Sequence, residues 1–423
     1  MIIHQKRLGG DIMTSRERIM SAIAHKEPDR IPRDLGATPS SGISAIGYNK
    51  LIRHLGMTNV EDAHIYDVVQ QLAQPEMSVL DHFNIDVLDV GRTFNEKKED
   101  WKPFPLPDGS NSMVPKWFNW EVHNDGCIEV YQNDISIARM PVGATYFDGT
   151  YIPYPEEIPE TFEDLDVQMG RILWSAMTHS PWDHAKDDNF WAELRKRAIA
   201  LKESSDKALM IVCGCNLFEW GTFLRGIDNF LCDLLLDPEG VERMLDELMI
   251  RHLDTLDKVC KSVGDVCDIM RFGDDLGMDS GPFMRPDIYR DLFFPKHKQL
   301  NEFVHKNSSM KTFLHSCGSL YPLMPSLIEA GYDVLNPIQI TARDMQADKL
   351  KKDFGKDICF WGGGCDTRAI LNRGTVQEVK DHVKKQADIL APGGGFVFNT
   401  VHNIMPDVPP ENIVAMFEAL DEL

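Results

Sequence analysis

The sequence predicts an α/β fold of the (β/α)8 TIM-barrel type, in which eight parallel strands close into a ring inside a layer of helices. Regular alternation between short apolar runs and helical stretches from 311 to 420 is the first reason. Uninterrupted apolar runs such as 208–213 are the second, because they suit strands buried on both faces of a parallel sheet. The predicted strands cover 31–36, 85–90, 208–213, 266–272, 311–314, 333–336, 357–361 and 395–399.

A doubly wound open sheet is the alternative that the same alternation allows. No G-x-G-x-x-G sequence follows the first predicted strand, which counts against a dinucleotide-binding fold of this kind. The glycines 393–395 precede their strand instead of following it, so they are interpreted as a turn. The closed barrel, with its active site at the carboxyl ends of the strands, is therefore the preferred prediction.

Residues 91–163 have a different texture from the rest of the chain. Aromatic residues, prolines and glycines are dense there, and polar and apolar residues alternate at 127–131 and 136–140. This pattern predicts a β-rich insertion made of hairpins, which serves as a lid, as a partner-binding flap, or only as a shield for one end of the barrel. Residues 1–12 are interpreted as an N-terminal extension, and 13–423 as a single domain that starts with a helix after Met13.

Composition excludes several classes of function. The 423 residues carry a formal net charge of −22 with no cluster of lysine and arginine, which argues against binding to nucleic acid or to anionic membranes. No run of about 18 apolar residues is present, so no transmembrane helix is expected. Nine scattered cysteines, an odd number, indicate a reducing compartment without a disulfide framework, and hence a cytoplasmic protein.

Two glycine-flanked segments at strand ends predict a metal site. His315 and Cys317 lie two residues apart at the end of one strand, so both side chains point the same way. Cys365 follows the glycines 362–364 at the end of another strand. Imidazole and thiolate are ligands that zinc prefers, and three protein ligands with one open position are typical of catalytic zinc. The alternative is a polar strand end with a buried thiol.

Polar residues at other strand ends complete the predicted site. The candidate catalytic residues are His402, Asp274 and Glu219, and the candidate substrate-binding residues are Asp275, Asn336 and Asn399. His402 is alternatively a fourth ligand, a substrate contact or an ordinary loop histidine. One of the paired aspartates, Asp274 and Asp275, is expected in the site and the other at the start of a helix. Two adjacent carboxyl groups can raise the pKa of one of them enough for proton transfer.

Motifs spread along most of the chain resemble the uroporphyrinogen decarboxylase superfamily, and within it the branch of zinc-dependent, corrinoid-linked methyltransferases. Each motif is short, but their order is specific to the superfamily. They are Arg16-Glu17-Arg18-Ile19, Pro28-Asp29-Arg30-Ile31-Pro32, Leu224-Arg225-Gly226, Asp237-Pro238, His315-Ser316-Cys317-Gly318, the segment 361–367 and Pro409-Pro410-Glu411-Asn412.

The chain departs from this superfamily at two places. The decarboxylase has an arginine-rich segment after its first strand, which binds the porphyrin carboxylates, whereas this chain has one arginine and an aspartate, Arg33-Asp34. Members that form methyl-coenzyme M have a third zinc-binding cysteine in the glycine turn before the last strand. That turn is 391–395 here and contains no cysteine, so the resemblance implies that Cys365 replaces it.

The resemblance implies a zinc-dependent enzyme that moves a methyl group between a small methylated substrate, such as a methyl ether in an O-demethylation, and a corrinoid (cobalamin). The chain contains no Asp-x-His-x-x-Gly motif, so the corrinoid is expected on a partner protein. A homodimer is compatible with the sequence. Two alternatives stay open, a metal-independent decarboxylase of a uroporphyrinogen-like or other small acid, and a ligand-binding barrel without catalytic activity.

Overall fold

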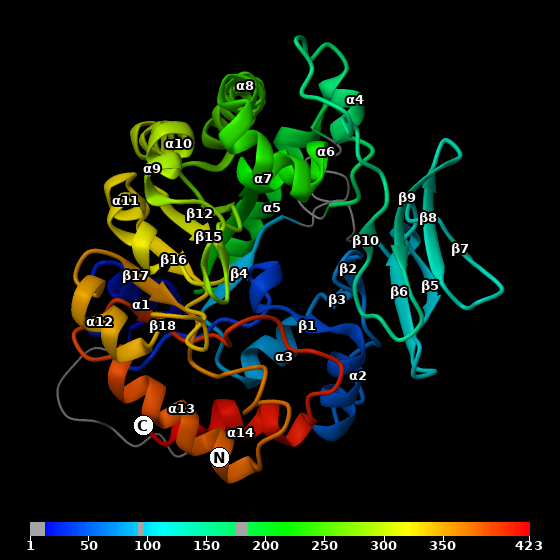
Figure 1. The fold of residues 1–423 in the computed structure, drawn as a ribbon. Coiled ribbons are helices and arrows are strands. Elements are labelled where there is room, and N and C mark those ends of the chain that lie inside the picture. The colour runs from blue at the N-terminus through cyan, green and yellow to red at the C-terminus, as the bar shows by residue number, and fades with distance from the viewer. Residues whose placement is uncertain (1–12, 92–96, 175–184) are drawn as a thin grey trace.

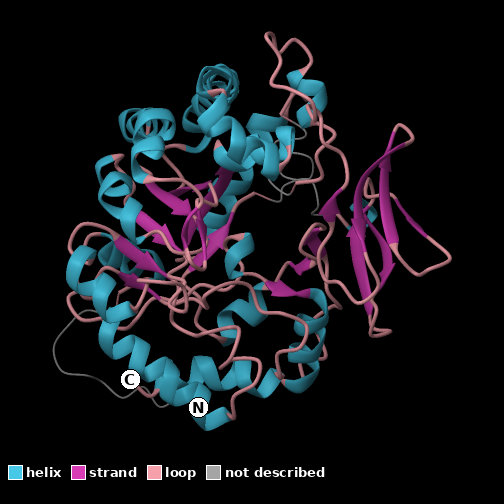
Figure 2. Cartoon of the chain, in the orientation of Figure 1, coloured by secondary structure: helices cyan, strands magenta, loops and turns pink. Residues whose placement is uncertain are grey.

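A curled sheet of parallel strands forms the centre of the protein, and helices cover its outer face (Figures 1 and 2). The computed structural model describes residues 13–91, 97–174 and 185–423. Seven strands pair in the order β18-β17-β16-β15-β12-β11-β4. Each overlaps a predicted strand: β4 (Val87–Asp89), β11 (Ala208–Gly214), β12 (Ile269–Gly273), β15 (Lys311–His315), β16 (Val334–Asn336), β17 (Cys359–Trp361) and β18 (Phe396–Val397).

The eighth predicted strand, at 31–36, is not a strand in the structure. Only Arg33 forms a bridge, to Phe398, and the seven-stranded sheet does not close as a continuous ring. Two features of the segment explain the correction. Pro32 has no N–H to donate to a ladder, and the Arg33 N–H bonds to the side chain of Asp86 at 2.9 Å instead of to a strand carbonyl.

The segment nevertheless lies between the two outer strands of the sheet. Phe398 donates its N–H to the Pro32 carbonyl at 2.8 Å, and the Asp34 N–H bonds to the Phe398 carbonyl at 2.9 Å. On the other side, the Asp86 N–H bonds to the Arg33 carbonyl at 2.9 Å. These three hydrogen bonds connect the segment to β18 and to the start of β4.

The inner face of the curled sheet is filled by apolar side chains at alternate strand positions. The cluster includes Ile269, Phe313, Val334 and Val397, each from a different strand, and the side chains are buried. Helix α1 (Ser15–Ile23) adds Ile19, Ala22 and Ile23 to the same cluster. Because α1 contacts the amino-terminal starts of β11 and β18, it covers that end of the sheet and leaves the carboxyl end for a site.

Helices that connect successive strands pack on the outer face of the sheet. Helix α8 (Pro238–Val263) is capped by Asp237, whose side chain accepts the Gly240 N–H at 2.9 Å, and Pro238 occupies its first position, where no N–H is needed. The helices that follow α1 are α2 (Ala45–His54), α3 (Met77–His82), α4 (Leu165–Met169), α5 (Phe190–Ser204), α6 (Phe218–Arg225), α7 (Ile227–Leu236), α8 (Pro238–Val263), α9 (Pro286–Ile288), α10 (Phe294–Asn307), α11 (Met324–Glu329), α12 (Ala347–Phe354), α13 (Val376–Leu390) and α14 (Pro410–Asp421).

The segment predicted as a β-rich insertion forms antiparallel sheets beside the central sheet, on the right of Figure 1. The two segments with alternating residues become β8 and β9, which pair as a hairpin. The strands here are β5 (Trp101–Pro105), β6 (Asn111–Pro115), β7 (Trp120–Val122), β8 (Ile128–Gln132), β9 (Ile135–Met140) and β10 (Asp148–Gly149). Elsewhere, β1 (Ile43–Ser44), β2 (Ile65–Asp67) and β3 (Leu72–Ala73) form a three-stranded sheet, and β13 (Gly277–Met278) pairs with β14 (Gly281–Pro282).

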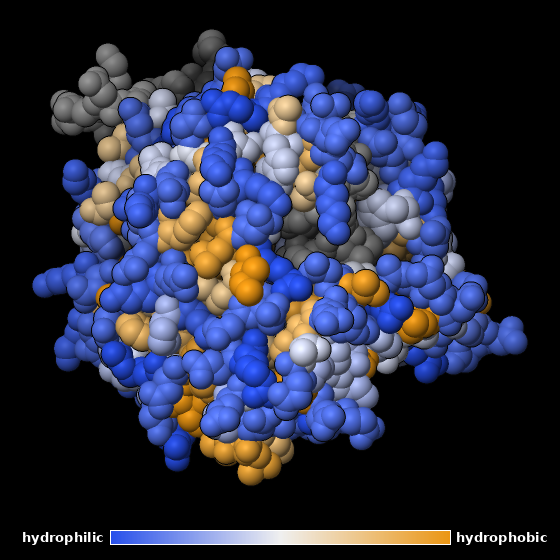
Figure 3. Space-filling view, turned by 90° about the horizontal axis from the view of Figure 1, so that it is seen from above, coloured by the Kyte–Doolittle hydropathy of each residue, from blue (hydrophilic) through white to orange (hydrophobic). Residues whose placement is uncertain are grey.

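The surface is mostly hydrophilic in the view from above, and hydrophobic residues form only small groups there (Figure 3). This agrees with the formal net charge of −22. Among the residues that the structure describes, every helix is too short or too polar to cross a membrane. The predicted N-terminal extension, residues 1–12, lies outside the described residues.

Asp34 gives the fold a testable dependence on pH. Its buried carboxylate accepts hydrogen bonds from Trp361 Nε1 at 2.8 Å and from the Ala37 N–H at 3.0 Å. Burial nevertheless raises the pKa of Asp34 to about 6. The folded state therefore binds a proton at Asp34 more tightly than the unfolded state does. The stability that protonated Asp34 contributes is lost as the pH rises from about 4 to about 6.

We expect an Asp34→Asn variant to lose less stability over this interval than the wild type, by about 2–3 kcal/mol. Urea unfolding at several pH values measures the difference. Asp265→Asn is the matched control, because Arg195 lowers the pKa of Asp265 to about 2 and its titration falls below the interval. Parallel stability curves for Asp34→Asn and the wild type would show that Asp34 is ionised throughout.

Candidate metal centre and cavity

Polar side chains form the inward-facing layer at the carboxyl ends of the strands. Arg271, His315 and Asn336 each come two residues after a member of the apolar cluster, namely Ile269, Phe313 and Val334. Because side chains alternate along a strand, these three residues face the same interior as the apolar residues below them. The inward-facing side chains therefore change from apolar to polar between one inward-facing position and the next, at the carboxyl ends of the strands where the loops begin.

His315, Cys317 and His402 are brought together as a candidate metal centre. One ligand atom from each lies within 4.8 Å of the others, and Cys317 Sγ is 3.5 Å from His315 Nε2. Zinc bonds of roughly 2.0–2.3 Å in a tetrahedron place ligand atoms about 3–4 Å apart, so the residues fit a zinc ion with small adjustments. Three protein ligands leave a fourth position for a substrate.

Asn336 orients the His315 imidazole from behind. The Nδ1–H of His315 donates to Asn336 Oδ1 at 2.7 Å, which leaves Nε2 free to face Cys317. The same oxygen accepts the Ser40 hydroxyl at 2.7 Å, and Asn336 Nδ2 donates to the Trp361 carbonyl at 2.9 Å. Such partners of metal-binding histidines fix the tautomer and the ring orientation. Asn336, which the sequence predicted to bind substrate, therefore contacts the far side of the imidazole and does not line the cavity.

The electrostatics of the three groups favour a cation. Burial, with the positive charge of Arg271, lowers the pKa of His315 to about 3, so the imidazole is neutral and its Nε2 carries a lone pair. Burial also lowers the pKa of His402. Burial and the carboxylates of Asp275 and Glu219 raise the pKa of Cys317. A divalent cation reverses this last effect, because a coordinating thiol loses its proton.

Cys365 is not part of the group that the structure brings together. The left-handed turn at Gly362 and Gly363, with φ of 98° and 76°, leads the chain alongside Thr400. The Cys365 carbonyl there accepts the Val401 N–H at 2.9 Å, and its side chain is buried within the main apolar core. His402, from the loop after β18, takes the third position that the sequence predicted for Cys365.

The two adjacent aspartates have separate positions. Asp274 accepts the N–H groups of Phe218 and Glu219, both at 3.0 Å, and contacts His297 Nε2 at 3.0 Å. It therefore caps α6 and does not line the cavity. Asp275 lines the cavity, where Oδ1 accepts the Cys317 N–H at 2.8 Å and lies 3.6 Å from His315 Nε2.

Glu219 faces the cavity from the first turn of α6. Its carboxyl group contacts Asn216 Nδ2 and accepts the Asp275 N–H at 3.2 Å. Burial, followed by the nearby carboxylates of Asp275 and Asp274, raises the pKa of Glu219 well above its usual value. A carboxyl group that keeps its proton beside a metal centre can act as a general acid.

The cavity next to the candidate metal centre is small, about 80 Å³. Of the predicted residues, Glu219, Asp275, His315 and His402 line it. Asn399 does not, and its buried amide has no hydrogen-bond partner among the described residues. Further lining residues, which the sequence analysis did not select, are Pro39, Ser40, Gln70, Trp174, Val212, Asn216 and Arg271. Arg271 had one signal, because it is the only charged residue in the strand 269–273.

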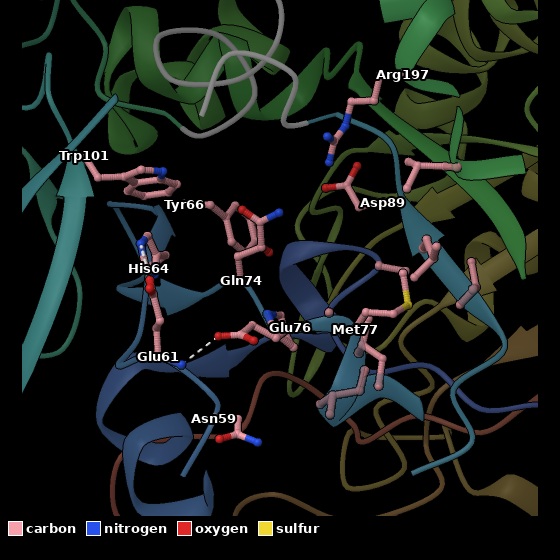
Figure 4. A pocket seen from close by; sticks show the side chains of 18 of the residues that line it. Asn59, Glu61, His64, Tyr66, Gln74, Glu76, Met77, Asp89, Trp101 and Arg197 are labelled. Atoms are coloured by element: carbon pink, nitrogen blue, oxygen red, sulfur yellow. Dashed lines mark hydrogen bonds and ion pairs between the residues drawn. The ribbon is translucent and has the colours of Figure 1, made fainter. Parts of the chain in front are cut away.

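A second cavity, of about 620 Å³, opens beside β2 and β4 (Figure 4). Tyr66, Trp101 and His64 lie on one side of it in this view, and Asp89 and Arg197 on the other. It contains none of the predicted site residues and shares no lining residue with the smaller cavity. Size alone therefore does not identify the reaction centre, and the smaller cavity is the one that adjoins the candidate ligands.

Comparison with known proteins finds similarity to one family model and to solved structures. Residues 215–423 match the family model of uroporphyrinogen decarboxylase (URO-D). A solved structure, a methyltransferase from Methanosarcina mazei, aligns with a TM-score of 0.58 at 16% sequence identity, covering 97% of this chain and 98% of that chain. At this identity the alignment establishes a shared fold. No curated protein matches the sequence.

Proposed function

Because residues 215–423 place the chain in the uroporphyrinogen decarboxylase superfamily, we propose that it is a zinc-dependent methyltransferase. It moves a methyl group between a small methylated substrate, such as a methyl ether, and a corrinoid carried by a separate protein. The observation that carries this proposal is the group formed by His315, Cys317 and His402 beside a cavity. The likeness in fold to a methyltransferase adds support.

The cavity residues have distinct roles in the proposed reaction. Zinc bound by His315, Cys317 and His402 would supply a Lewis acid for the heteroatom that carries the methyl group. The partner's corrinoid, when bound, would supply the nucleophile and its electron pair for the methyl group, and the oxygen would keep the electron pair of the broken bond. Glu219 gives a proton to the oxygen, and Asp275 holds the Cys317 loop through its backbone N–H.

We also propose that the segment 32–34 takes the place of the first strand and so completes a (β/α)8 barrel. Its hydrogen bonds to Phe398 and Asp86 support this reading. In this arrangement 13–423 forms one domain, and the insertion beside the sheet helps to dock the corrinoid protein. All nine cysteines are free, which supports a cytoplasmic location.

The decarboxylase alternative meets two obstacles at the site. The Arg33 guanidinium, which would have to bind a porphyrin carboxylate, pairs with Asp421 at 2.6 Å and with the Phe83 carbonyl at 3.2 Å. Arg33 does not line the cavity beside the metal centre. That cavity, about 80 Å³, is also far smaller than a tetrapyrrole. A small methylated compound fits it better.

Metal removal tests the proposed function. We expect the purified protein to contain about one zinc ion per chain, the stoichiometry of a single catalytic site. Incubated with methyl ethers and reduced cobalamin, it should produce methylcobalamin, which absorbance detects. A chelator should abolish the transfer, and added zinc should restore it. Release of carbon dioxide from a small acid in the presence of chelator would favour the decarboxylase, and a bound ligand without turnover would favour the binding barrel.

A further inference from the structure

Arg271 is a buried arginine without a counter-ion. Its side chain projects from β12 into the cavity beside the candidate metal centre, and the residue is only 7% exposed. It makes no side-chain hydrogen bond or ion pair with any residue in the described parts of the chain, and its Nε is a buried donor without an acceptor. Leaving a charged group buried and unpaired costs several kcal/mol, so an anion is expected to bind there.

The other buried arginines in the described parts of the chain are paired, which makes Arg271 the exception. Arg18 pairs with Asp29 and Asp86 at 2.6 and 2.8 Å. Arg33 pairs with Asp421 and Arg225 with Asp233, at 2.6 and 2.7 Å. The fold thus pairs a carboxylate with each of these three guanidinium groups, whereas no carboxylate of the described residues forms an ion pair with the guanidinium in the cavity.

The nearest carboxyl groups do not replace the missing anion. Glu219 and Asp275 influence the pKa of Arg271 through space, but neither forms an ion pair with it among the described contacts. Glu219 is engaged by Asn216 and by the Asp275 N–H, and Asp275 accepts the Cys317 N–H. Both carboxyl groups are therefore held by other donors, while the guanidinium keeps its own donors for a ligand.

The surroundings of Arg271 are shaped to leave these donors accessible. A Cβ atom at Gly273 would lie 2.8 Å from Arg271 Nη1 and 2.9 Å from Asn216 Nδ2, so the glycine makes room for both groups. Trp174 also lines the cavity, and its Nε1 is a second buried donor without a partner among the described residues. Two unpaired N–H donors in one small cavity are what an oxyanion requires.

We propose that Arg271 is the carboxylate-binding residue of this site, and that the substrate is a small methylated carboxylic acid. Its carboxylate binds the guanidinium while its methyl-bearing heteroatom reaches the centre formed by His315, Cys317 and His402. The inference deepens the proposed function and rests on it for the methyl group. A single guanidinium matches a substrate with one carboxylate, in contrast to the several carboxylates of a porphyrinogen.

Binding of matched probes tests the carboxylate subsite. Methoxyacetate and its neutral analogue methoxyacetamide have similar size, and calorimetric titration of the full chain measures their Kd. We expect the wild type to prefer methoxyacetate by about tenfold or more, and an Arg271→Met variant to lose that preference. Arg271→Lys should restore part of it, because a positive charge remains. Methanesulfonate in the same assay shows whether another oxyanion competes for the guanidinium.

Two controls separate this inference from the proposed function. Cys317→Ser should lose zinc but keep an Arg271-dependent preference for the carboxylate, so methyl transfer can fail while the subsite stands. Arg33→Met removes a buried but paired arginine and should leave the preference unchanged. Equal Kd values for methoxyacetate and methoxyacetamide, equal methoxyacetate affinity in the wild type and Arg271→Met, or no methoxyacetate binding would overturn the proposal.

Thermal unfolding gives a readout that does not depend on ligand choice. Replacing an unpaired buried charge by an apolar side chain of similar length is neutral or stabilising, whereas removing a paired one is destabilising. We therefore expect Arg271→Met to unfold at the same temperature as the ligand-free wild type or higher, and Arg33→Met to unfold at a lower temperature. A lower Tm for Arg271→Met would assign the arginine a structural role.

Discussion

A Cys317→Ser variant is expected to lose its bound zinc and at least about 100-fold of its methyl-transfer activity. Even changes to residues that only orient metal ligands reduce affinity or activity by about 10–100-fold, so removal of a ligand should cost more. A serine hydroxyl in this buried position keeps its proton far more readily than a thiol and provides no soft anionic ligand. Elemental analysis of the purified variant measures the zinc, and methylcobalamin formation measures the activity.

His402→Ala and Cys365→Ser distinguish the two candidates for the third ligand. The structure brings His402 to the group with His315 and Cys317, whereas the sequence predicted Cys365 for this position. His402→Ala should therefore lose zinc, and Cys365→Ser should retain it. The matched control is Cys359→Ser, which removes another fully buried thiol from the chain. Zinc retained by His402→Ala but lost by Cys365→Ser would assign the ligand to the cysteine.

The parts of the site that follow from strand geometry could be predicted from the sequence. The spacing of His315 and Cys317 at a strand end places both side chains together, because a strand alternates with a period of two. The apolar runs likewise located all seven strands of the sheet. These predictions need only local pattern and the rule that carboxyl ends of parallel strands share one edge.

The parts that depend on loop paths could not be predicted. The structure groups His402, and not Cys365, with His315 and Cys317, since left-handed glycines at 362 and 363 turn the chain towards Thr400, and the sequence does not reveal that direction. The significance of Arg271 lies in the absence of an ion pair with the carboxyl groups of the cavity among the described residues, and that absence is visible only in three dimensions. The predicted strand at 31–36 failed because a distant side chain, Asp86, takes the Arg33 N–H.

Removal of Asp86 should strongly reduce the stability of the fold. Its carboxylate is fully buried and accepts hydrogen bonds from Arg18 Nη1, Arg30 Nη1 and Arg30 Nη2, each at 2.8 Å, and from the Arg33 N–H at 2.9 Å. These contacts join α1, the segment after it and the start of β4. An Asp86→Ala variant leaves the buried Arg18 guanidinium with one partner fewer, so we expect the free energy of unfolding to fall by about 3–5 kcal/mol.

Urea unfolding of Asp86→Ala measures this loss, and Asp265→Ala is the matched control. Asp265 also accepts two hydrogen bonds from one arginine, Arg195, but this pair is exposed and should contribute little to stability. Hydrogen exchange locates the effect. The Asp34 and Phe398 N–H groups, which connect the segment to β18, should exchange faster in Asp86→Ala because Arg33 has lost its anchor. Unchanged exchange at both positions, with equal stability losses in the two variants, would show that Asp86 does not hold the segment 32–34 against the sheet.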